Sequence, residues 1–132
     1  MAFAKLDLLL HMHTEQFVGA ADVEPLLRSA ISDCLVQTVP PAPTIAKRFN
    51  HIFAEPVGYA GGYYSYKWAE VLEADAFTRF KREGIFNPVL GEEFVDKILS
   101  RGNSADPEEL FRSFMGRDPD PGALLARSGL VS

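Results

Sequence analysis

The stretch with the greatest capacity for chemistry is GYAGGYYSYKW, which begins at Gly58 and contains all four tyrosines of the chain. In a helix, which turns by about 100° per residue, Tyr59, Tyr63 and Tyr66 would share one face. A phenol has an ordinary pKa of about 10, so its hydroxyl stays protonated at neutral pH and can donate a hydrogen bond to a developing negative charge. Three such donors on one face favour a polar cleft that binds a ligand.

A second interpretation of the phenols stays open at this point. Buried hydroxyls need partners, so the rings could be ordinary aromatic side chains at the edge of a core, each bonded to a main-chain carbonyl. The glycines at 58, 61 and 62 favour the cleft, because glycine inside a helix costs about 0.5–1 kcal/mol relative to alanine. Flexible backbone beside hydroxyl donors suggests a loop that closes on a ligand.

Helices are expected throughout the N-terminal half that must position these groups. Apolar residues follow the helical period from Phe3 to about Phe17. Asp22 can cap a second helix whose buried stripe runs from Leu26 to Leu35, and the proline cluster that begins at Pro40 should end it.

A third, short helix is expected over residues 44–53, and the tyrosine-rich stretch should begin a fourth. Contact-forming side chains lie nearly all round the first turns of that fourth helix, with Tyr64 and Trp68 on the side away from the other phenols. A helix of this composition is expected to be buried and not to lie on a surface.

The C-terminal third carries three helix starts that are read from local sequence. Asn87-Pro88, Asp106-Pro107 and Asp120-Pro121 each place a capping side chain directly before a proline at the first helical position. Gly102 should stop the first of these helices. The side chains expected to be buried on them are Phe94, Ile98, Leu99, Leu110, Phe111, Phe114, Met115, Leu124 and Leu125.

Composition excludes several classes of protein. The chain has 132 residues, 47% of them apolar, as in one globular domain, and a formal net charge of −5. The acidic balance argues against nucleic-acid or membrane partners, and no run approaches the roughly 20 apolar residues that cross a bilayer. One cysteine, Cys34, rules out an internal disulfide, and a cytoplasmic location is expected.

A series of short motifs runs along the chain: HIF from His51, GYA from Gly58, GYYSY from Gly62, WAEV from Trp68, ADAF from Ala74, GIFN from Gly84, ILSRG from Ile98 and GRDP from Gly116. Together they resemble the thimet oligopeptidase and oligopeptidase A family of zinc peptidases, which includes peptidyl-dipeptidases. The resemblance covers nearly the whole chain and is strongest from Phe49 to Leu130. It implies a hydrolase of short peptides.

The resemblance also implies roles for residues of the tyrosine-rich stretch. By motif position, His51, Tyr59 and Tyr66 would be catalytic residues that hydrogen-bond the substrate backbone and the oxyanion formed during hydrolysis. Substrate-binding residues are then expected at Tyr63, Gly58 and Gly62.

The zinc ligands of such an enzyme are missing from this sequence. They require H-E-x-x-H on a helix and a further carboxylate, and the chain has no such motif. His11 and His13 would point about 200° apart on a helix, and Glu70 and Glu73 have no histidine at a suitable spacing. We therefore expect zinc to be the cofactor of a longer parent enzyme and to be bound by no residue of this chain. We also expect the chain alone to be inactive.

The fold expected from both lines of reasoning is all-α, a compact bundle of about six or seven helices that forms the C-terminal part of a zincin-like peptidase domain. Residues 1–43 should form an N-terminal helical hairpin and residues 44–132 a C-terminal segment with the His/Tyr motif, together a partial domain. Expected partners are short peptides, the upstream catalytic region of the parent, and a second copy of the isolated chain. The alternative is a stand-alone, non-catalytic helical interaction module.

Overall fold

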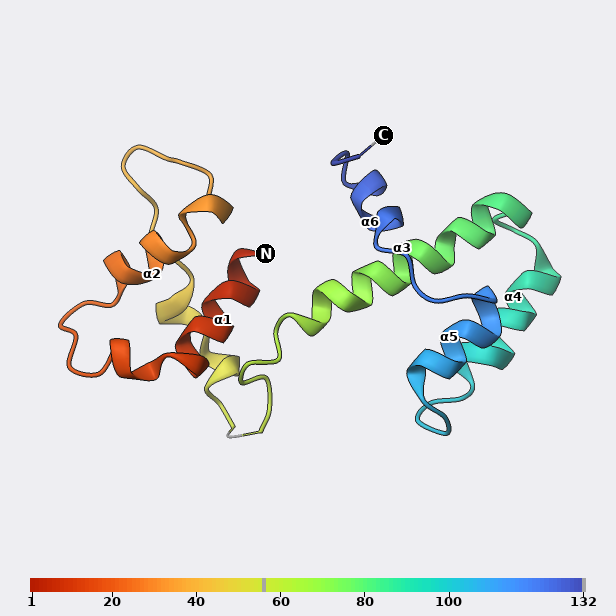
Figure 1. Ribbon diagram of the computed structural model, residues 1–132, viewed down its shortest axis with the longest axis horizontal. Coiled ribbons are helices and arrows are strands. Elements are labelled where there is room, and N and C mark those ends of the chain that lie inside the picture. The colour runs from red at the N-terminus through yellow and green to blue at the C-terminus, as the bar shows by residue number, and fades with distance from the viewer. Residues whose placement is uncertain (56, 132) are drawn as a thin grey trace. The chain divides into compact units, whose positions relative to one another are not determined.

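The computed structural model describes residues 1–55 and 57–131, and this part of the chain is all-α, as expected. It contains six α-helices, joined by 3₁₀ turns and one π-helical turn, and no strand is found in it (Figure 1). Residues Met1–Lys67 form one compact unit and Trp68–Ser132 a second. Within the described ranges, no helix has both the length and the apolar character needed to span a membrane.

In the first unit, α1 (Ala2–Met12, red in Figure 1) and α2 (Glu24–Ala30, orange) contribute to a shared core. Its buried members are Leu6, Leu27, Ile31, Phe49 and Ile52. Burying a side chain of this kind stabilises a fold by about 1.5–3 kcal/mol. Isolated helices of this length are marginal in water, so tertiary packing and not helix propensity holds them in place.

The first helix is shorter than the sequence predicts. It ends at Met12 and not near Phe17, because His13 leaves the helix with φ −130° and ψ 42°. The His13 amide still donates to the Leu9 carbonyl and closes the last turn. A separate 3₁₀ turn follows at Thr14–Gln16.

The second helix also differs from the expectation. Asp22 does bond the first turn, since its Oδ1 accepts from the Glu24 amide at 3.2 Å. However, α2 ends at Ala30, well before Pro40, so the prolines do not terminate it. Leu26, which was expected in the buried stripe, is exposed.

The helix expected over 44–53 is wrong as a single element. Two 3₁₀ turns, Ala46–Arg48 and Asn50–Ile52, take its place. Phe49 lies between them with φ −85° and ψ 50°, outside the helical region. This break allows Phe49 and Ile52 both to enter the core of the first unit.

The tyrosine-rich helix begins later than the sequence predicts. It is α3 (Ser65–Glu83), and the residues from Tyr59 to Tyr64 form turns instead. The Gly62 amide donates to the Tyr59 carbonyl at 2.9 Å, and the Ser65 amide donates to the Gly62 carbonyl at 3.0 Å. Gly61 has φ +68°, a left-handed conformation that interrupts any helix and that glycine adopts most readily.

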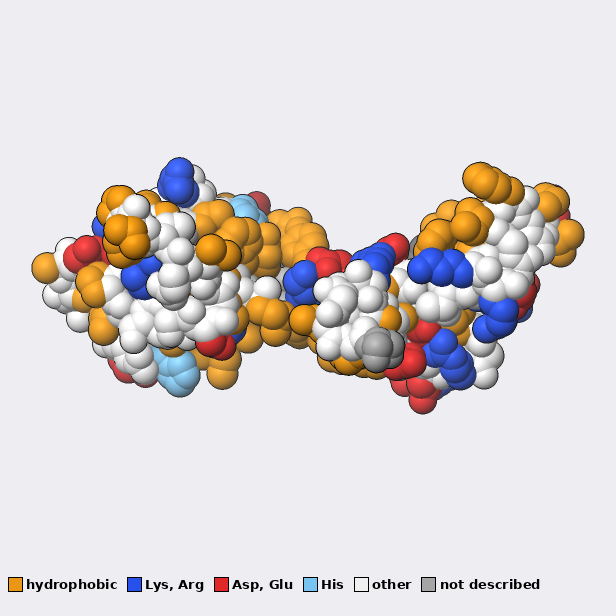
Figure 2. Space-filling view, turned by 90° about the horizontal axis from the view of Figure 1, so that it is seen from above, with side chains coloured by type: hydrophobic (Ala, Val, Ile, Leu, Met, Phe, Trp, Pro, Cys, Tyr) orange, Lys and Arg blue, Asp and Glu red, His pale blue; other side chains and the backbone are white. Residues whose placement is uncertain are grey.

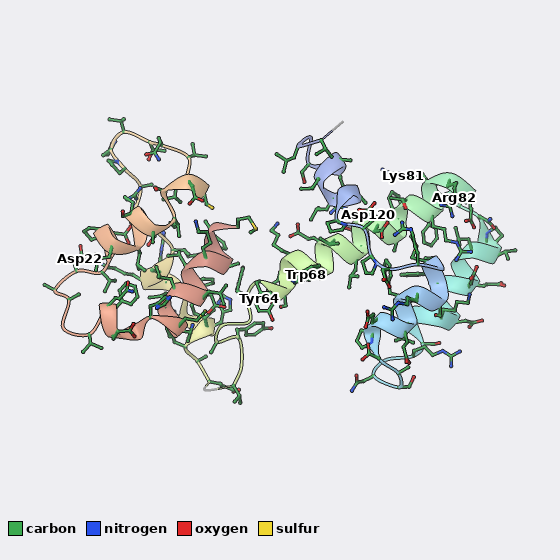
Figure 3. All side chains as sticks on the ribbon, viewed as in Figure 1. Asp22, Tyr64, Trp68, Lys81, Arg82 and Asp120 are labelled. Carbon is green, nitrogen blue, oxygen red and sulfur yellow. The ribbon has the colours of Figure 1, made fainter. Side chains whose placement is uncertain are left out.

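The expected burial of this region is also wrong. Tyr64 is 48% exposed and Trp68 is 56% exposed. Figure 3 shows both labelled side chains projecting from the ribbon, Tyr64 just before α3 and Trp68 from its first turns. Aromatic character all round a helix therefore did not indicate burial in this chain.

The second unit contains the rest of α3 together with α4 (Pro88–Phe94), a π-helical turn (Val95–Leu99), α5 (Pro107–Met115) and α6 (Gly122–Arg127). Three phenylalanine rings join α3, α4 and α5. The ring centroid of Phe80 lies 5.7 Å from that of Phe94 and 6.0 Å from that of Phe114, and the last two are 5.2 Å apart. Aromatic rings at these separations stabilise the packing by more than the burial of their apolar surface alone.

Two of the predicted helix starts are confirmed. Asn87 caps α4 by accepting hydrogen bonds from the Val89 and Leu90 amides, and Asp106 caps α5 by accepting from the Glu108 amide. The buried face of α5 also contains Phe111 and Phe114, as expected. Leu99 is a correction, since it was expected on a buried face and is exposed.

A buried carboxylate ties α3 to the segment that enters α6. Asp75 Oδ1 accepts from Arg117 Nη2 at 2.6 Å, and Asp75 Oδ2 accepts from Arg117 Nη1 and from the Asp120 amide, both at 2.7 Å. Figure 3 labels Asp120 beside α3. Burial opposes ionisation of Asp75, but the bonds from Arg117 and the Asp120 amide outweigh it and lower the pKa of the carboxyl.

Candidate functional site

The sequence-predicted catalytic residues belong to one cluster of rings in the first unit. The ring centroids of His51 and Tyr59 are 5.4 Å apart. Those of Tyr59 and Tyr66 are 6.2 Å apart, with the ring planes only 8° from parallel. Tyr63 lies 5.0 Å from Tyr66 and 5.8 Å from His51. We call His51, Tyr59, Tyr63 and Tyr66 the aromatic cluster.

The tyrosines come together by a different route from the one that the sequence suggested. Only Tyr66 lies in α3, whereas Tyr59 and Tyr63 belong to the preceding turns. The helical spacing that led to a shared face therefore does not describe the backbone. The rings are nevertheless neighbours, because the turn around Gly61 brings Tyr59 back beside the first turn of the helix.

The members of the aromatic cluster differ in exposure. Tyr59 is 47% exposed and Tyr66 is 46% exposed, so both reach solvent. Tyr63 packs partly buried against the hydrophobic core of the first unit and lies 5.0 Å from the ring of Phe49. Tyr63 thus anchors the cluster to the core, while Tyr59 and Tyr66 form its open side.

The two exposed phenols interact through their side chains. A hydrogen bond between Tyr59 and Tyr66 raises the pKa of Tyr66 above its ordinary value of 10.0, and partial desolvation acts in the same direction. A phenol with a raised pKa keeps its proton at neutral pH. On the open side of the cluster, Tyr66 therefore presents a hydroxyl group, which can donate a hydrogen bond, and not a phenolate anion.

His51 comes from the 3₁₀ turn Asn50–Ile52. Its ring meets that of Phe49 edge-on at 5.0 Å and that of Tyr59 edge-on at 5.4 Å. Phe49 is buried in the core, so the imidazole is held between the core and the open phenol pair. An imidazole in this place can donate or accept a hydrogen bond beside the tyrosine hydroxyls.

The glycines expected to bind substrate lie in the turns beside the cluster. Gly62 donates its amide to the Tyr59 carbonyl, and a Cβ placed on it would meet that oxygen at an ordinary 3.5 Å. The Gly58 amide lies 3.5 Å from the Glu55 carbonyl. Gly61, which was expected to give the loop flexibility but not to bind substrate, has a left-handed backbone that favours glycine.

One residue that contacts this region was not identified from the sequence. Asp7 on α1 is fully buried, and its carboxylate accepts from the Gly61 amide at 2.9 Å and from the Tyr63 amide at 2.8 Å. His11 Nδ1 lies 2.8 Å from the same carboxylate, and the His11 ring stacks on Phe53 at 5.1 Å. The available signal was an acidic residue inside the apolar run of α1.

The residues present do not fit a zinc site. Across residues 1–55 and 57–131, no three histidine, cysteine, aspartate or glutamate side chains are grouped so that they could hold a metal ion. His11 is engaged by Asp7, and Glu73 is bonded by Arg127.

The second unit has an apolar cavity of about 460 Å³. Side chains of α3, α4, the π-helical turn and α5 line it, and Glu73 is the ionisable residue in its wall. A hydrolytic site needs several polar groups that converge on one point. The aromatic cluster meets this requirement better than the cavity does.

Comparison with known proteins decides the family. A profile described as peptidase family M3 matches residues 1–130. The chain belongs to peptidase family M3. This agrees with the resemblance that the tyrosine-rich motifs indicated.

The chain is similar to proteins named oligopeptidase A and dipeptidyl carboxypeptidase. Oligopeptidase A of Escherichia coli is 46% identical over 98% of this chain and 19% of its own length, and oligopeptidase A of Haemophilus influenzae is 58% identical over 64% and 12%. Dipeptidyl carboxypeptidase of Escherichia coli is 34% identical over 98% and 19%. The M3 chain thus spans a fifth or less of the length of these relatives.

Proposed function

We propose that this M3 chain supplies part of the wall of the peptide-binding site in a zinc-dependent oligopeptidase, and that it does not cleave peptides alone. The proposal is supported above all by the stacked pair of Tyr59 and Tyr66, which is open to solvent beside His51. The zinc ligands and the remaining walls of the site would come from another part of the parent enzyme. The parent would act on short peptides in the cytoplasm.

In this proposal the two exposed phenols are catalytic residues that touch the reacting atoms. Attack on a peptide carbonyl turns its oxygen into an oxyanion, and Tyr59 and Tyr66 would donate hydrogen bonds to that oxygen. The two rings are stacked with centroids 6.2 Å apart, so both hydroxyls belong to neighbouring side chains that one substrate carbonyl could meet. A donor aimed at an oxyanion is worth about 10²–10³ in rate.

The other members of the site would bind and orient the substrate. His51 would hydrogen-bond the substrate backbone from beside Tyr59. Tyr63 would hold the ring of Tyr66 in place from the core side, where the centroids are 5.0 Å apart. Gly58 and Gly62 would leave room for the peptide backbone to approach, since neither presents a side chain.

The proposal is tested in a chimera in which this chain replaces the matching segment of the Escherichia coli oligopeptidase A. With a fluorogenic oligopeptide, the chimera should hydrolyse substrate, whereas this chain alone with added zinc should not. Tyr59→Phe and Tyr66→Phe should each lower kcat by about 10²–10³ with little change in KM, because each removes a bond made mainly in the transition state. Tyr64→Phe, which removes the hydroxyl of an exposed tyrosine outside the cluster, is the matched control.

Two results would contradict the proposal. One is a chimera in which Tyr59→Phe and Tyr66→Phe retain the kcat of the Tyr64→Phe control. The other is turnover by the isolated, purified chain that is lost in Tyr66→Phe.

A non-catalytic interaction module is the second candidate, and the exposed apolar side chains of the second unit favour it. Figure 2 shows hydrophobic side chains on the surface of that unit, and Phe86 is 97% exposed. Large exposed apolar patches are uncommon in monomers and often bind partners. An inactive chimera, together with a binding partner that is lost in Phe86→Ser, would favour the module over the enzyme part.

A further inference from the structure

A buried carboxylate in the first unit takes no direct part in the proposed reaction. Asp7 is 0% exposed and lies on α1, whereas the aromatic cluster begins at His51, 44 residues later in the chain. Removing an ionised carboxylate from water is costly unless its oxygens are hydrogen-bonded. The partners of Asp7 therefore indicate what its burial achieves.

Both carboxylate oxygens of Asp7 have partners. Oδ1 accepts from the Gly61 amide at 2.9 Å and lies 2.8 Å from His11 Nδ1, and Oδ2 accepts from the Tyr63 amide at 2.8 Å. Hydrogen bonds from backbone amides to an ionised carboxylate are roughly twice as strong as bonds between neutral groups. The two amides flank Gly62, so the carboxylate binds the middle of the turn formed by residues 59–63. We call this segment the tyrosine turn.

The position of that turn sets the positions of the phenols. Tyr59 lies at its start, bonded through its carbonyl to the Gly62 amide, and Tyr63 lies at its end. Gly61 adopts φ +68°. A glycine in a free chain samples this conformation together with several others, so the local sequence alone does not fix the turn. A rigid external acceptor on α1 can fix it.

We propose that Asp7 is a positioning residue for the candidate active site. By accepting the Gly61 and Tyr63 amides, it holds the turn in the arrangement in which the Tyr59 ring stacks on the Tyr66 ring and both phenols reach solvent. One turn further along α1, His11 Nδ1 lies 2.9 Å from the Asp7 carbonyl oxygen and 2.8 Å from the carboxylate. The inference rests on the proposed function, since its value for catalysis depends on those hydroxyls acting on substrate.

A purely structural role for Asp7 makes a different prediction. If the carboxylate only stabilised the first unit, its removal would loosen α1 and the tyrosine turn alike. If it positions the turn, its removal should free the turn and the phenol pair while α1 stays folded, because α1 also packs through Leu6 in the hydrophobic core.

The first experiment uses the unmodified full chain in solution. The hydrogen bonds should give through-bond scalar couplings between the amide nitrogens of Gly61 and Tyr63 and the carboxyl carbon of Asp7. Absence of both couplings in the folded chain would overturn the proposal without the need for any variant.

The second experiment compares Asp7→Asn with Asp33→Asn. An asparagine in place of Asp7 keeps the shape but offers one acceptor oxygen and one amino group, so it satisfies at most one of the two amides well. Asp33 is an exposed carboxylate of the same unit that pairs with Lys5 at 2.7 Å, and it controls for the loss of one charge. Hydrogen exchange and the titration of tyrosine absorbance are measured for each.

In Asp7→Asn, exchange at Gly61 and Tyr63 should become about tenfold faster or more, the change expected for one lost bond to a charged group. The titration of Tyr66 should move down towards its ordinary value as the bond to Tyr59 is lost. The amides of Leu9 and Leu10 in α1 should change far less, and Asp33→Asn should match the unmodified chain.

Unchanged exchange at Gly61 and Tyr63, an unmoved titration of Tyr66, or equal loss of protection along α1 would each overturn the proposal. These readouts need no catalysis. If Tyr59→Phe and Tyr66→Phe leave the chimera active while Asp7→Asn still frees the turn, the proposed function fails and the structural link between Asp7 and the phenols stands.

Discussion

The ion pair between Asp75 and Arg117 should contribute to the stability of the second unit, and its geometry indicates how much free energy of unfolding is lost without it. Asp75 is 1% exposed and receives two hydrogen bonds from the Arg117 guanidinium and one from the Asp120 amide. Arg117→Ala removes two of these three bonds and leaves a buried carboxylate with one donor. Breaking a fully buried pair in this way costs about 3–5 kcal/mol.

The expected loss is smaller here, because the partner is not fully buried. The side chain of Arg117 is 45% exposed, so water can reach the carboxylate once the guanidinium is gone. Hydrogen bonds to charged groups contribute about 1.5–3 kcal/mol. We therefore expect Arg117→Ala to lower the free energy of unfolding by about 2–3 kcal/mol. Arg117→Lys should lower it by a smaller amount, because an ammonium cannot bond both carboxylate oxygens as a guanidinium does.

The assay is urea unfolding followed by the fluorescence of Trp68, the chain's single tryptophan, which belongs to the second unit together with Asp75 and Arg117. The matched control is Arg82→Ala, which removes an exposed arginine paired with Glu83 and should cost less than about 1 kcal/mol. Equal unfolding midpoints for Arg117→Ala and Arg82→Ala would refute the reasoning that the buried carboxylate depends on its guanidinium.

Two further predictions concern acid stability and the core. Hydrogen bonds from Arg79 and Lys97 lower the pKa of Glu93 from 4.5 to about 2, so its contribution to stability is present above pH 4.5 and is lost as the pH falls towards 2. Glu93→Gln should flatten that loss when urea midpoints are measured across this range, and an equally steep loss in the variant would contradict the assignment. Leu27→Ala, at a fully buried core position, should lower the free energy of unfolding by about 2–5 kcal/mol in circular dichroism melts, whereas Leu99→Ala, at an exposed position, should cost far less.

Features that depend on neighbouring residues were predictable from the sequence. The caps at Asn87 and Asp106 were read correctly because a capping side chain bonds amides two or three residues away. The all-α class followed from the helical period of apolar residues. Capping and periodicity are properties of a short window, and a single sequence displays them directly.

Features set by distant contacts were not predictable in the same way. The turn at Gly61 is bonded by a carboxylate that lies 54 residues earlier in the sequence. No local pattern in the tyrosine-rich stretch predicts that contact. Phe49 breaks the helix expected over 44–53 because its side chain belongs in a core shared with α1 and α2. The residues of the candidate site were chosen by motif resemblance, and their catalytic roles stay predictions for the chimera to test.

The contact between Tyr59 and Tyr66 affects how Tyr66 behaves in alkaline solution. Because the pKa of Tyr66 lies above its ordinary value of 10.0, this phenol ionises only in solutions more basic than those in which an isolated phenol does. Once one phenol has ionised, its negative charge opposes loss of the second proton. A parent enzyme that loses activity in mildly basic solution would therefore owe that loss to groups other than Tyr66.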